Sequence, residues 1–389
     1  MTAEVGVINR RGVALAADSA VTINNSKVTN SAVKLFTLDS AHYVGIMFFG
    51  NANLQNIPWE VIIKSYREKI GNKAFNKLQD YVDDFKTYVS LLPVWNSLES
   101  QWSMIYKYAL TIINTLNSLI KGGKTLEQAI SAAVQLISTE RSLDVDRNKL
   151  TNNFKTKISN QFKNSFENIT DTQCDKCVKL TIDLLMSNFT PDDYTGIVFA
   201  GYGKTEMFPA IYKLQVDGVV DGKIRISNTD VTSCNPLRDD DAGASIVTFA
   251  QSDVMRTVIY GIAPELNKYR EKQLESLETT IAKYFPKDQR GQVKTLFSNY
   301  DQAFTKHFMQ EYVSPITSML DTLSISELGS MAEMLVNLTA FKRKFTNDIG
   351  TVGGPIDVLT ISRGEGPIWI KRKEYFDKDL NEGYRLRRK

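Results

Sequence analysis

The first fifty residues contain short apolar runs that come in pairs, and this pairing limits the fold more than any other feature of the chain. Residues 3–10 and 12–18 form the first pair, with a turn at residues 10–12. Residues 33–38 and 43–49 form the second pair. Strands that follow one another this closely pair antiparallel, whereas parallel strands need a long crossover connection. The pattern therefore predicts a layered α+β fold rather than a doubly wound parallel sheet.

Beyond these strands, long helical stretches alternate with further short strands. Helical periodicity covers about residues 73–190 and 251–346. Strand patterns return between the two stretches and after the second, at residues 196–200, 210–216, 223–227, 356–362 and 368–371. Two Asp-Gly pairs, Asp217-Gly218 and Asp221-Gly222, are both predicted to be turns.

Composition and charge exclude several classes of partner. Hydrophobic residues make up 42% of the 389 residues, and the net charge of +3 favours neither nucleic acid nor a membrane as partner. The basic residues 371–373 and 387–389 are expected to be solvated. Three cysteines do not make a disulfide framework and fit a reducing compartment. Because we find no secretory signal and no apolar run of about 20 residues, we expect a soluble, cytoplasmic protein.

Thr2 is a candidate N-terminal nucleophile. A hydroxyl needs a base to remove its proton, and an N-terminal threonine carries its own base in the free α-amine. Met1 blocks that amine, but methionine before a small residue such as threonine is a usual substrate for removal. The exposed Thr2 would then hold a hydroxyl and an amine, whose ordinary pKa is about 7.7–8.0, within one residue.

Asp18 and Lys34 are placed to tune such a site. A nearby cation lowers the pKa of the amine and favours the alkoxide, and an anion can hold that cation in position. Asp18 ends the second predicted strand, so a hairpin of the first two strands returns it to the level of Thr2. Lys34 opens the third predicted strand and can reach the same end of the sheet.

The segment Gly12–Ser19 resembles the signature of proteasome β-subunits. Asp18 follows Thr2 by 16 residues and Lys34 follows it by 32, which are the intervals of that family. Residues 44–50 are similar to the family strand that builds the oxyanion hole. On this resemblance the chain is identified as a divergent bacterial-type member with a helical insertion.

The resemblance implies a fold, an activity and an assembly. The fold would be the four-layer αββα sandwich of N-terminal-nucleophile hydrolases, of the α+β class, with a large all-helical insertion. The activity would be that of a threonine endopeptidase, which cleaves a peptide or protein through an acyl-enzyme ester without a cofactor or metal. Family members form rings, which implies a homo-oligomeric ring and a possible unfoldase partner.

The resemblance also implies catalytic roles for individual residues. Thr2 is the nucleophile, Lys34 tunes its amine, and Asp18 orients Lys34. Ser252 and Asp348 match the further serine and aspartate of the family.

Substrate contacts follow from the same resemblance. The backbone N–H of Phe49 or Gly50 would donate to the oxyanion. The substrate would add as a strand along Thr22. Ala32 and Met47 fall where the family lines its specificity pocket, which implies an apolar side chain at that position of the substrate.

Three segments follow from this interpretation. Residues 1–75 are the N-terminal part of the hydrolase core, and residues 76–190 are the helical insertion. Residues 191–389 complete the core, with extra helices at about 265–345.

Two other functions are compatible with these residues, and two further motifs are misleading. The chain could be a catalytically inactive scaffold of the same fold, or an N-terminal-nucleophile amidase acting on a small molecule.

The two Gly-Lys-Thr triplets lack the earlier glycine of a phosphate-binding loop. Cys174 and Cys177 have metal-ligand spacing, but zinc needs about four ligands and the two histidines are distant in sequence. We expect a packed or a surface pair of thiols.

Overall fold

The computed structural model describes residues 3–23, 27–29, 31–38, 41–137, 140–237, 243–250, 252–345, 353–374, 376 and 379–381. It has mixed α and β structure with antiparallel sheets, as the strand pairs of the sequence predict. The chain divides into two compact units. Unit 1 consists of Met1–Gly45, Ala200–Ile211 and Thr232–Lys389, and unit 2 consists of Ile46–Phe199 and Tyr212–Val231.

A five-stranded antiparallel sheet organises unit 1. Its order is β12-β1-β2-β13-β14, and the strands are Ala244–Ala250, Glu4–Asn9, Gly12–Ala17, Asp357–Ser362 and Gly366–Lys371 respectively. The β1–β2 hairpin turns after Asn9, as predicted, because Asn9 Oδ1 accepts hydrogen bonds from the backbone N–H groups of Arg11 at 2.9 Å and Gly12 at 3.3 Å. Glu4 lies opposite Ala17 at the open end of this hairpin.

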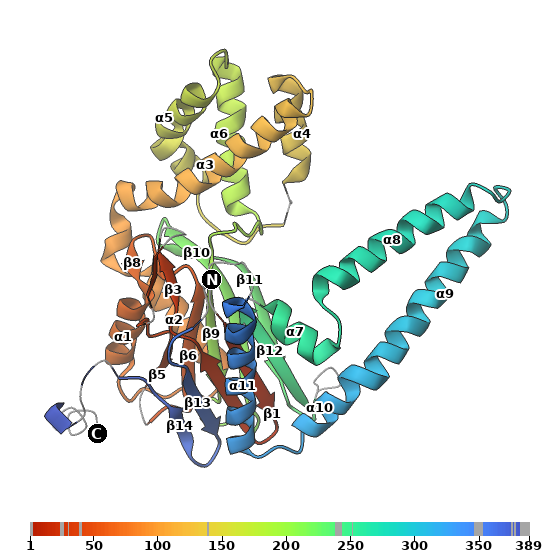
Figure 1. The fold of residues 1–389 in the computed structure, drawn as a ribbon. Helices are drawn as coiled ribbons and strands as arrows, with labels where there is room; N and C mark the ends of the chain where they lie inside the picture. The colour runs from red at the N-terminus through yellow and green to blue at the C-terminus, as the bar shows by residue number, and fades with distance from the viewer. Residues whose placement is uncertain are drawn as a thin grey trace. The chain divides into compact units, whose positions relative to one another are not determined.

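Helix α11, Ile325–Lys344, lies along one face of this sheet (Figure 1). Side chains on a strand alternate between faces. Every second residue at the chain start therefore packs with α11, in an apolar cluster that includes Ala3, Val5, Val7, Leu328, Ala332, Leu335 and Val336. Glu4 and Gly6 face the other side, where a Cβ on Gly6 would come within 2.9 Å of Ile211.

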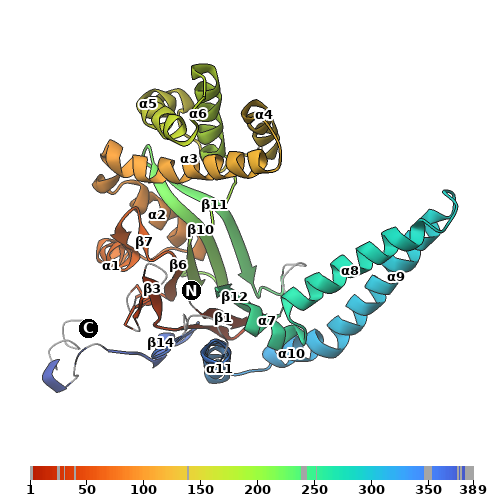
Figure 2. The same cartoon turned by 45° about the horizontal axis from the view of Figure 1, so that its top comes forward.

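The other elements of unit 1 are short strands and helices. The strands β3 and β4 pair antiparallel, and β5 follows them; they span Val21–Ile23, Lys27–Thr29 and Leu35–Thr37. The helices are α7 at Ser252–Tyr260, α8 at Pro264–Ala282, α9 at Arg290–Phe308, η2 at Met309–Val313, α10 at Ser314–Leu320 and η3 at Asp379–Asn381. Helices α8 and α9 lie side by side as a long helical hairpin (Figure 2).

Unit 2 combines most of a second five-stranded sheet with a group of helices. The sheet has the order β11-β10-β9-β6-β5, in which β6 is Val44–Gly50, β9 is Thr195–Gly201, β10 is Ala210–Val220 and β11 is Lys223–Ser233. A two-stranded sheet pairs β7, Asn53–Leu54, with β8, Ile57–Pro58. The helices are α1 at Trp59–Ile70, α2 at Leu78–Ser90, η1 at Pro93–Asn96, α3 at Leu98–Lys121, α4 at Leu126–Leu136, α5 at Arg147–Ser165 and α6 at Asp171–Met186.

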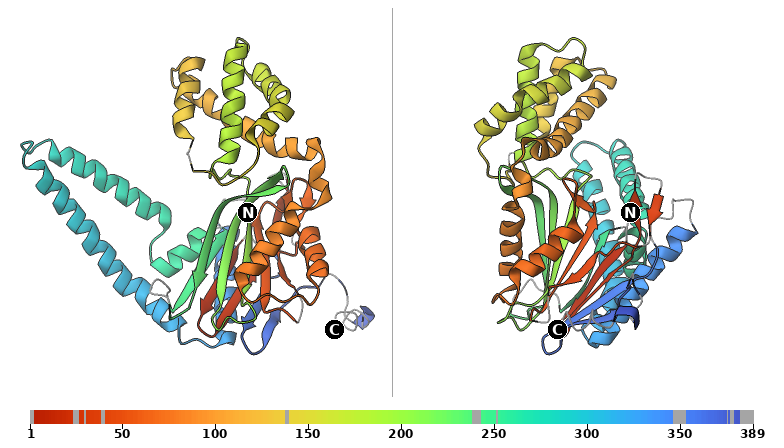
Figure 3. Two further views of the ribbon diagram at one scale, coloured as in Figure 1. Left: turned by 180° about the vertical axis from the view of Figure 1, so that it is seen from behind. Right: turned by 90° about the vertical axis from the view of Figure 1, so that its left-hand side faces the viewer.

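Helices α3 to α6 form one bundle within unit 2 (Figure 3). Their apolar stripes meet in a common core, which includes Tyr108, Ile112, Phe154, Phe162 and Leu185. Among all helices in the described ranges, none has an apolar stretch long enough to cross a membrane.

One of the two predicted Asp-Gly turns is wrong. Strand β10 continues through Asp217 and Gly218 to Val220, and the chain turns only at Asp221-Gly222, where φ is +49° and +67°. Gly218 is required by close packing, since a Cβ there would lie 2.4 Å from the sulfur of Met104. Asp217 stays in the strand because its carboxylate is buried against Arg225 of the neighbouring strand.

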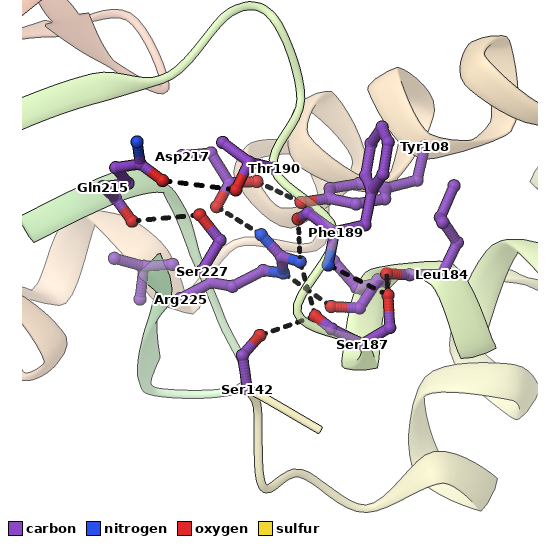
Figure 4. A network of polar contacts seen from close by, with 12 residues as sticks. Tyr108, Ser142, Leu184, Ser187, Phe189, Thr190, Gln215, Asp217, Arg225 and Ser227 are labelled. Carbon is purple, nitrogen blue, oxygen red and sulfur yellow. Dashed lines mark hydrogen bonds and ion pairs between the residues drawn. The ribbon is translucent and has the colours of Figure 1, made fainter. Parts of the chain in front are cut away.

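Arg225 is a fully buried cation whose guanidinium group is surrounded by acceptors (Figure 4). Its Nη1 donates to Asp217 Oδ1 at 2.8 Å, and Tyr108 of α3 donates to the second carboxylate oxygen. Its other nitrogens donate to backbone carbonyls at and after the end of α6, those of Leu185 at 2.6 Å, Ser187 at 2.7 Å and Phe189 at 2.6 Å. Burial and the charge of Asp217 raise the pKa of Tyr108. The network connects α3 and α6 to β10 and β11.

We predict that Arg225→Met destabilises the protein by about 3–5 kcal/mol, because it leaves the Asp217 carboxylate buried without its cation. The free energy of unfolding in urea measures the loss. Lys149→Met is the matched control, since it removes a cation from the largely exposed ion pair with Asp221 and should change stability little. Equal losses in the two variants would contradict the importance of the buried network.

Candidate active site

Lys34 is a buried cation held between two buried carboxylates. Its Nζ lies 2.6 Å from Asp18 Oδ1 and 3.1 Å from Glu4 Oε1. Lys34 and Asp18 are each 1% exposed, and Glu4 is 0% exposed. Charges are tolerated at such depth only when they are paired and hydrogen-bonded. The sequence spacing placed Asp18 beside Lys34, but nothing in the sequence assigned a role to Glu4.

The β1–β2 hairpin brings Asp18 to the start of the chain. The N–H of Asp18 donates to the carbonyl of Ala3 at 3.2 Å, and the N–H of Ala3 donates to Asp18 Oδ1 at 3.2 Å. The other carboxylate oxygen accepts a hydrogen bond from the N–H of Gly353 at 3.0 Å. Backbone donors therefore fix the carboxylate, and the carboxylate in turn fixes the Nζ of Lys34.

This arrangement can influence the charge of groups near the N-terminus. A buried ammonium group interacts with neighbouring charges more strongly than a solvated one, because the effective dielectric constant around it is lower. An amine or an alkoxide close to Lys34 would experience its positive charge, opposed by the negative charge of Glu4.

Lys373 forms a second buried cationic centre in the same unit. Its Nζ donates to Ser19 Oγ at 2.5 Å and to the carbonyl of Ala32, and it lies 3.3 Å from Asp357 Oδ2. Burial lowers the pKa of Lys373, and the charges of Lys34 and other cations lower it further, while Asp357 opposes the shift. The expectation that residues 371–373 are solvated is therefore wrong for Lys373, because three segments distant in sequence cover its side chain.

The remaining predicted residues of unit 1 have different placements. Thr2 and Asp348 lie outside the described residues. Thr22 lies on β3, opposite Val28 of β4. Ala32 is half-buried, and its N–H donates to the carbonyl of Ser19 at 3.2 Å. Ser252 is the first residue of α7 and is half-buried.

The predicted residues Met47, Phe49 and Gly50 belong to β6, in unit 2. The Phe49 ring is 3% exposed and packs directly over Gly196, where a Cβ would come 1.9 Å from a ring carbon. Gly50 has φ of +80°, and a Cβ there would lie 2.5 Å from the carbonyl oxygen of Tyr194. Glycine is therefore required at this position by both backbone conformation and space.

Cys174 and Cys177 are buried on α6, so of the two expected alternatives the pair is packed and not on the surface. Within the described ranges, no group of three or more histidine, cysteine or acidic side chains is arranged to hold a metal ion. Burial raises the pKa of Cys177 to about 12, with a smaller contribution from Cys174. Burial likewise raises the pKa of Cys174.

Comparison with known proteins finds similarity among solved structures, but none among family models or curated proteins. No family model and no curated protein matches the chain. Among solved structures, it is similar to Anbu from Hyphomicrobium sp. strain MC1, with 8% identity and a TM-score of 0.34 over 100% of this chain and 94% of that chain. It is also similar to the Gly-1 mutant of Anbu from the same strain, with 9% identity and a TM-score of 0.32 over 100% and 94% of the two chains. Anbu (ancestral beta-subunit) from Yersinia bercovieri matches with 10% identity and a TM-score of 0.34 over 99% and 93%.

The assignment of the chain to the proteasome β-subunit family as a divergent bacterial-type member is wrong. No model of that family matches the sequence, and the similar solved structures are Anbu proteins, a distinct proteasome-like group. The resemblance rested mainly on three residues within the first 34 positions of a 389-residue chain. Such a short pattern does not define a family.

We predict that Lys34→Met destabilises the protein by about 3–5 kcal/mol at pH 8, because Asp18 and Glu4 are left buried without their cation. The loss should be smaller at pH 5. Without the cation, buried carboxyl groups bind protons more readily in the folded than in the unfolded state, so stability falls as pH rises. Urea unfolding at the two pH values tests this, with the exposed Lys371→Met as control. A loss independent of pH would contradict it.

We predict that the three cysteines react slowly in the folded protein at pH 8. The thiolate is the reactive form, all three thiols are buried, and the raised pKa keeps Cys174 and Cys177 protonated. Titration with Ellman's reagent should detect three thiols promptly in urea and far fewer under native conditions. Rapid native labelling of Cys177, identified by peptide mass, would contradict the burial of this side chain.

Proposed function

We propose that this protein is a threonine-type peptide hydrolase that uses Thr2 as its nucleophile after removal of Met1. The observation that carries the proposal is the buried ion pair of Lys34 and Asp18, which lies against the backbone of Ala3. A lysine and an aspartate buried at the start of the chain have no need to be there for the packing of an apolar sheet. They fit a site in which the first residue of the mature chain reacts.

The reaction begins with proton transfer from the Thr2 hydroxyl to its own α-amine. The hydroxyl oxygen attacks the carbonyl carbon of the substrate, and a tetrahedral intermediate with a negatively charged oxygen forms. Collapse of this intermediate breaks the C–N bond, and the leaving amine takes the proton from the α-ammonium group. Water, deprotonated by the same amine, then hydrolyses the acyl ester and regenerates Thr2.

Lys34 and Asp18 support the first of these steps. The positive charge of Lys34 keeps the pKa of the Thr2 amine low enough for it to act as a base and stabilises the alkoxide that develops on the hydroxyl oxygen. Asp18 holds Nζ in position through the 2.6 Å contact. We assign further roles to Ser252 and Asp348, which would help to orient the amine.

Substrate contacts complete the proposal. The N–H of Phe49 or Gly50 would donate to the oxyanion, where loss of one donor typically costs a factor of about 10²–10³ in rate. Thr22 would hold the substrate backbone as an added strand, and Ala32 and Met47 would line an apolar specificity pocket.

The fold and the assembly extend the same proposal. The two five-stranded sheets would form the inner layers of a four-layer αββα sandwich, with residues 76–190 as a helical insertion into a core made of residues 1–75 and 191–389. The substrate would be a peptide or protein in the cytoplasm. Assembly of several copies into a ring, with an unfoldase as partner, would restrict access to unfolded chains.

We predict that the N-terminal peptide of the purified protein begins at Thr2 and that a β-lactone probe acylates it. Thr2→Val is the matched variant, because valine keeps the shape and still permits removal of Met1, but lacks the hydroxyl. Intact mass and peptide mapping measure both results. Thr2→Val should lose the label completely, whereas Thr2→Ser should keep it.

Two outcomes would overturn the proposal. One is Met1 retained on the native protein, since the amine would then be blocked. The other is a label that persists in Thr2→Val, which would place the nucleophile elsewhere. Mass analysis of the acyl group trapped on Thr2 with candidate substrates separates a peptide hydrolase from an amidase that acts on small molecules.

A further inference from the structure

We propose that Glu4 is a positioning residue for this reaction: with Asp18 it holds Lys34 between two carboxylates, and its charge sets the pH at which the Thr2 amine becomes a free base. The inference rests on the proposed function, but its central measurement does not require catalysis. Glu4 precedes no turn and caps no helix, and it stands in a strand whose other residues are mostly apolar.

Glu4 is in a position where an ionised carboxylate lowers the stability of the fold unless a cation lies beside it. It is 0% exposed and lies on β1, opposite Ala17 and Ala250 of the neighbouring strands. Burial of an ionised carboxylate is unfavourable without a charged partner, and its partner here is Lys34 Nζ at 3.1 Å. Asp18 is the other carboxylate partner of Lys34, so two carboxylates contact one cation in this group of three.

A neighbouring group of three residues contains two cations and one carboxylate. Asp357 lies 3.3 Å from Lys373 Nζ and 3.6 Å from Arg372 Nη1, so two cations share one carboxylate. Burial is the main cause that lowers the pKa of Lys373, and the charge of Lys34 lowers it further. The six charged groups balance as three cations and three anions, which come from β1, the end of β2, the segment before β5, β13 and the segment after β14. Glu4 is one of these three anions.

The interval between Glu4 and the proposed nucleophile links this charge to the reaction. Thr2 precedes Glu4 by two positions in the sequence, and in the proposed function its amine responds to the charge of Lys34, which Glu4 contacts. The negative charge of a carboxylate near an amine favours the protonated form of the amine, whereas the positive charge of Lys34 favours the free base. Glu4 thus moderates the effect of Lys34 and keeps the amine basic enough to accept the hydroxyl proton.

The test is Glu4→Gln, which keeps a side-chain oxygen for Lys34 and removes the charge. The N-terminal amine is titrated by pulse labelling with isotope-coded acetic anhydride over a range of pH, and the N-terminal peptide is quantified by mass. The midpoint should fall by about one pH unit in Glu4→Gln, because a nearby anion is lost. Glu365→Gln, an exposed carboxylate of the same unit, should leave the midpoint unchanged.

Kinetics separates positioning from a general loss of structure. The acidic limb of the pH profile of kcat/KM should move by the same amount as the amine midpoint, while KM stays nearly constant because Glu4 does not contact substrate. Glu4→Asp, which keeps the charge but shortens the side chain, should retain the wild-type profile with a lower kcat.

The charge balance offers a second variant in case Glu4→Gln does not fold. Glu4→Gln combined with Lys373→Met removes one anion and one cation, so the two changes in charge offset each other and the amine midpoint should return toward the wild-type value. Lys373→Met alone should raise the midpoint. An unchanged midpoint in all three variants would overturn the role of Glu4, whether or not the protein is active. A shifted midpoint in a protein without hydrolase activity would instead overturn the proposed function.

Discussion

The burial of Lys34 is the constraint on which the start of unit 1 depends. An ammonium group leaves water only if charged partners and hydrogen bonds replace its hydration. Asp18 and Glu4 supply them, and the register of the β1–β2 hairpin places both. Because Gly353 donates to the second oxygen of Asp18, the turn before β13 is fixed by the same group. One cation therefore connects the chain start, the end of β2 and the approach to β13.

Unit 2 also contains a buried cation paired with a buried carboxylate, but this cation has different partners. Arg225 is as deeply buried as Lys34, but most of its partners are backbone carbonyls after α6, and its carboxylate partner Asp217 also accepts from Tyr108. The planar guanidinium group can satisfy several acceptors in fixed directions, whereas an ammonium group acts as a compact point charge. Arg225 is therefore suited to hold helices against strands, and Lys34 to act on a neighbouring charge.

Local patterns predicted those parts of the fold in which neighbouring residues decide the conformation. The turn after Asn9 and the turn at Asp221-Gly222 both formed as expected. Asp217-Gly218 has the same letters as the second turn, yet it remains inside β10, because Arg225 and Met104 lie against it. The prediction that the basic residues 371–373 are solvated was wrong for Lys373 because of contacts that are likewise distant in sequence. Nothing near Lys373 in the sequence indicates that Ser19 and Ala32 cover its side chain.

The sequence by itself determined that Asp18 returns to the chain start, because a short turn and continuous strand pairing set the register of a hairpin. Its spacing also indicated that Lys34 reaches the same place. Only the tertiary structure decided that Glu4 joins them and that Asp357 lies beside both Lys373 and Arg372. The two residues of a pair are 30 positions apart for Glu4 and Lys34, and 354 positions apart for Ser19 and Lys373. Such contacts leave no periodic or local pattern in the sequence.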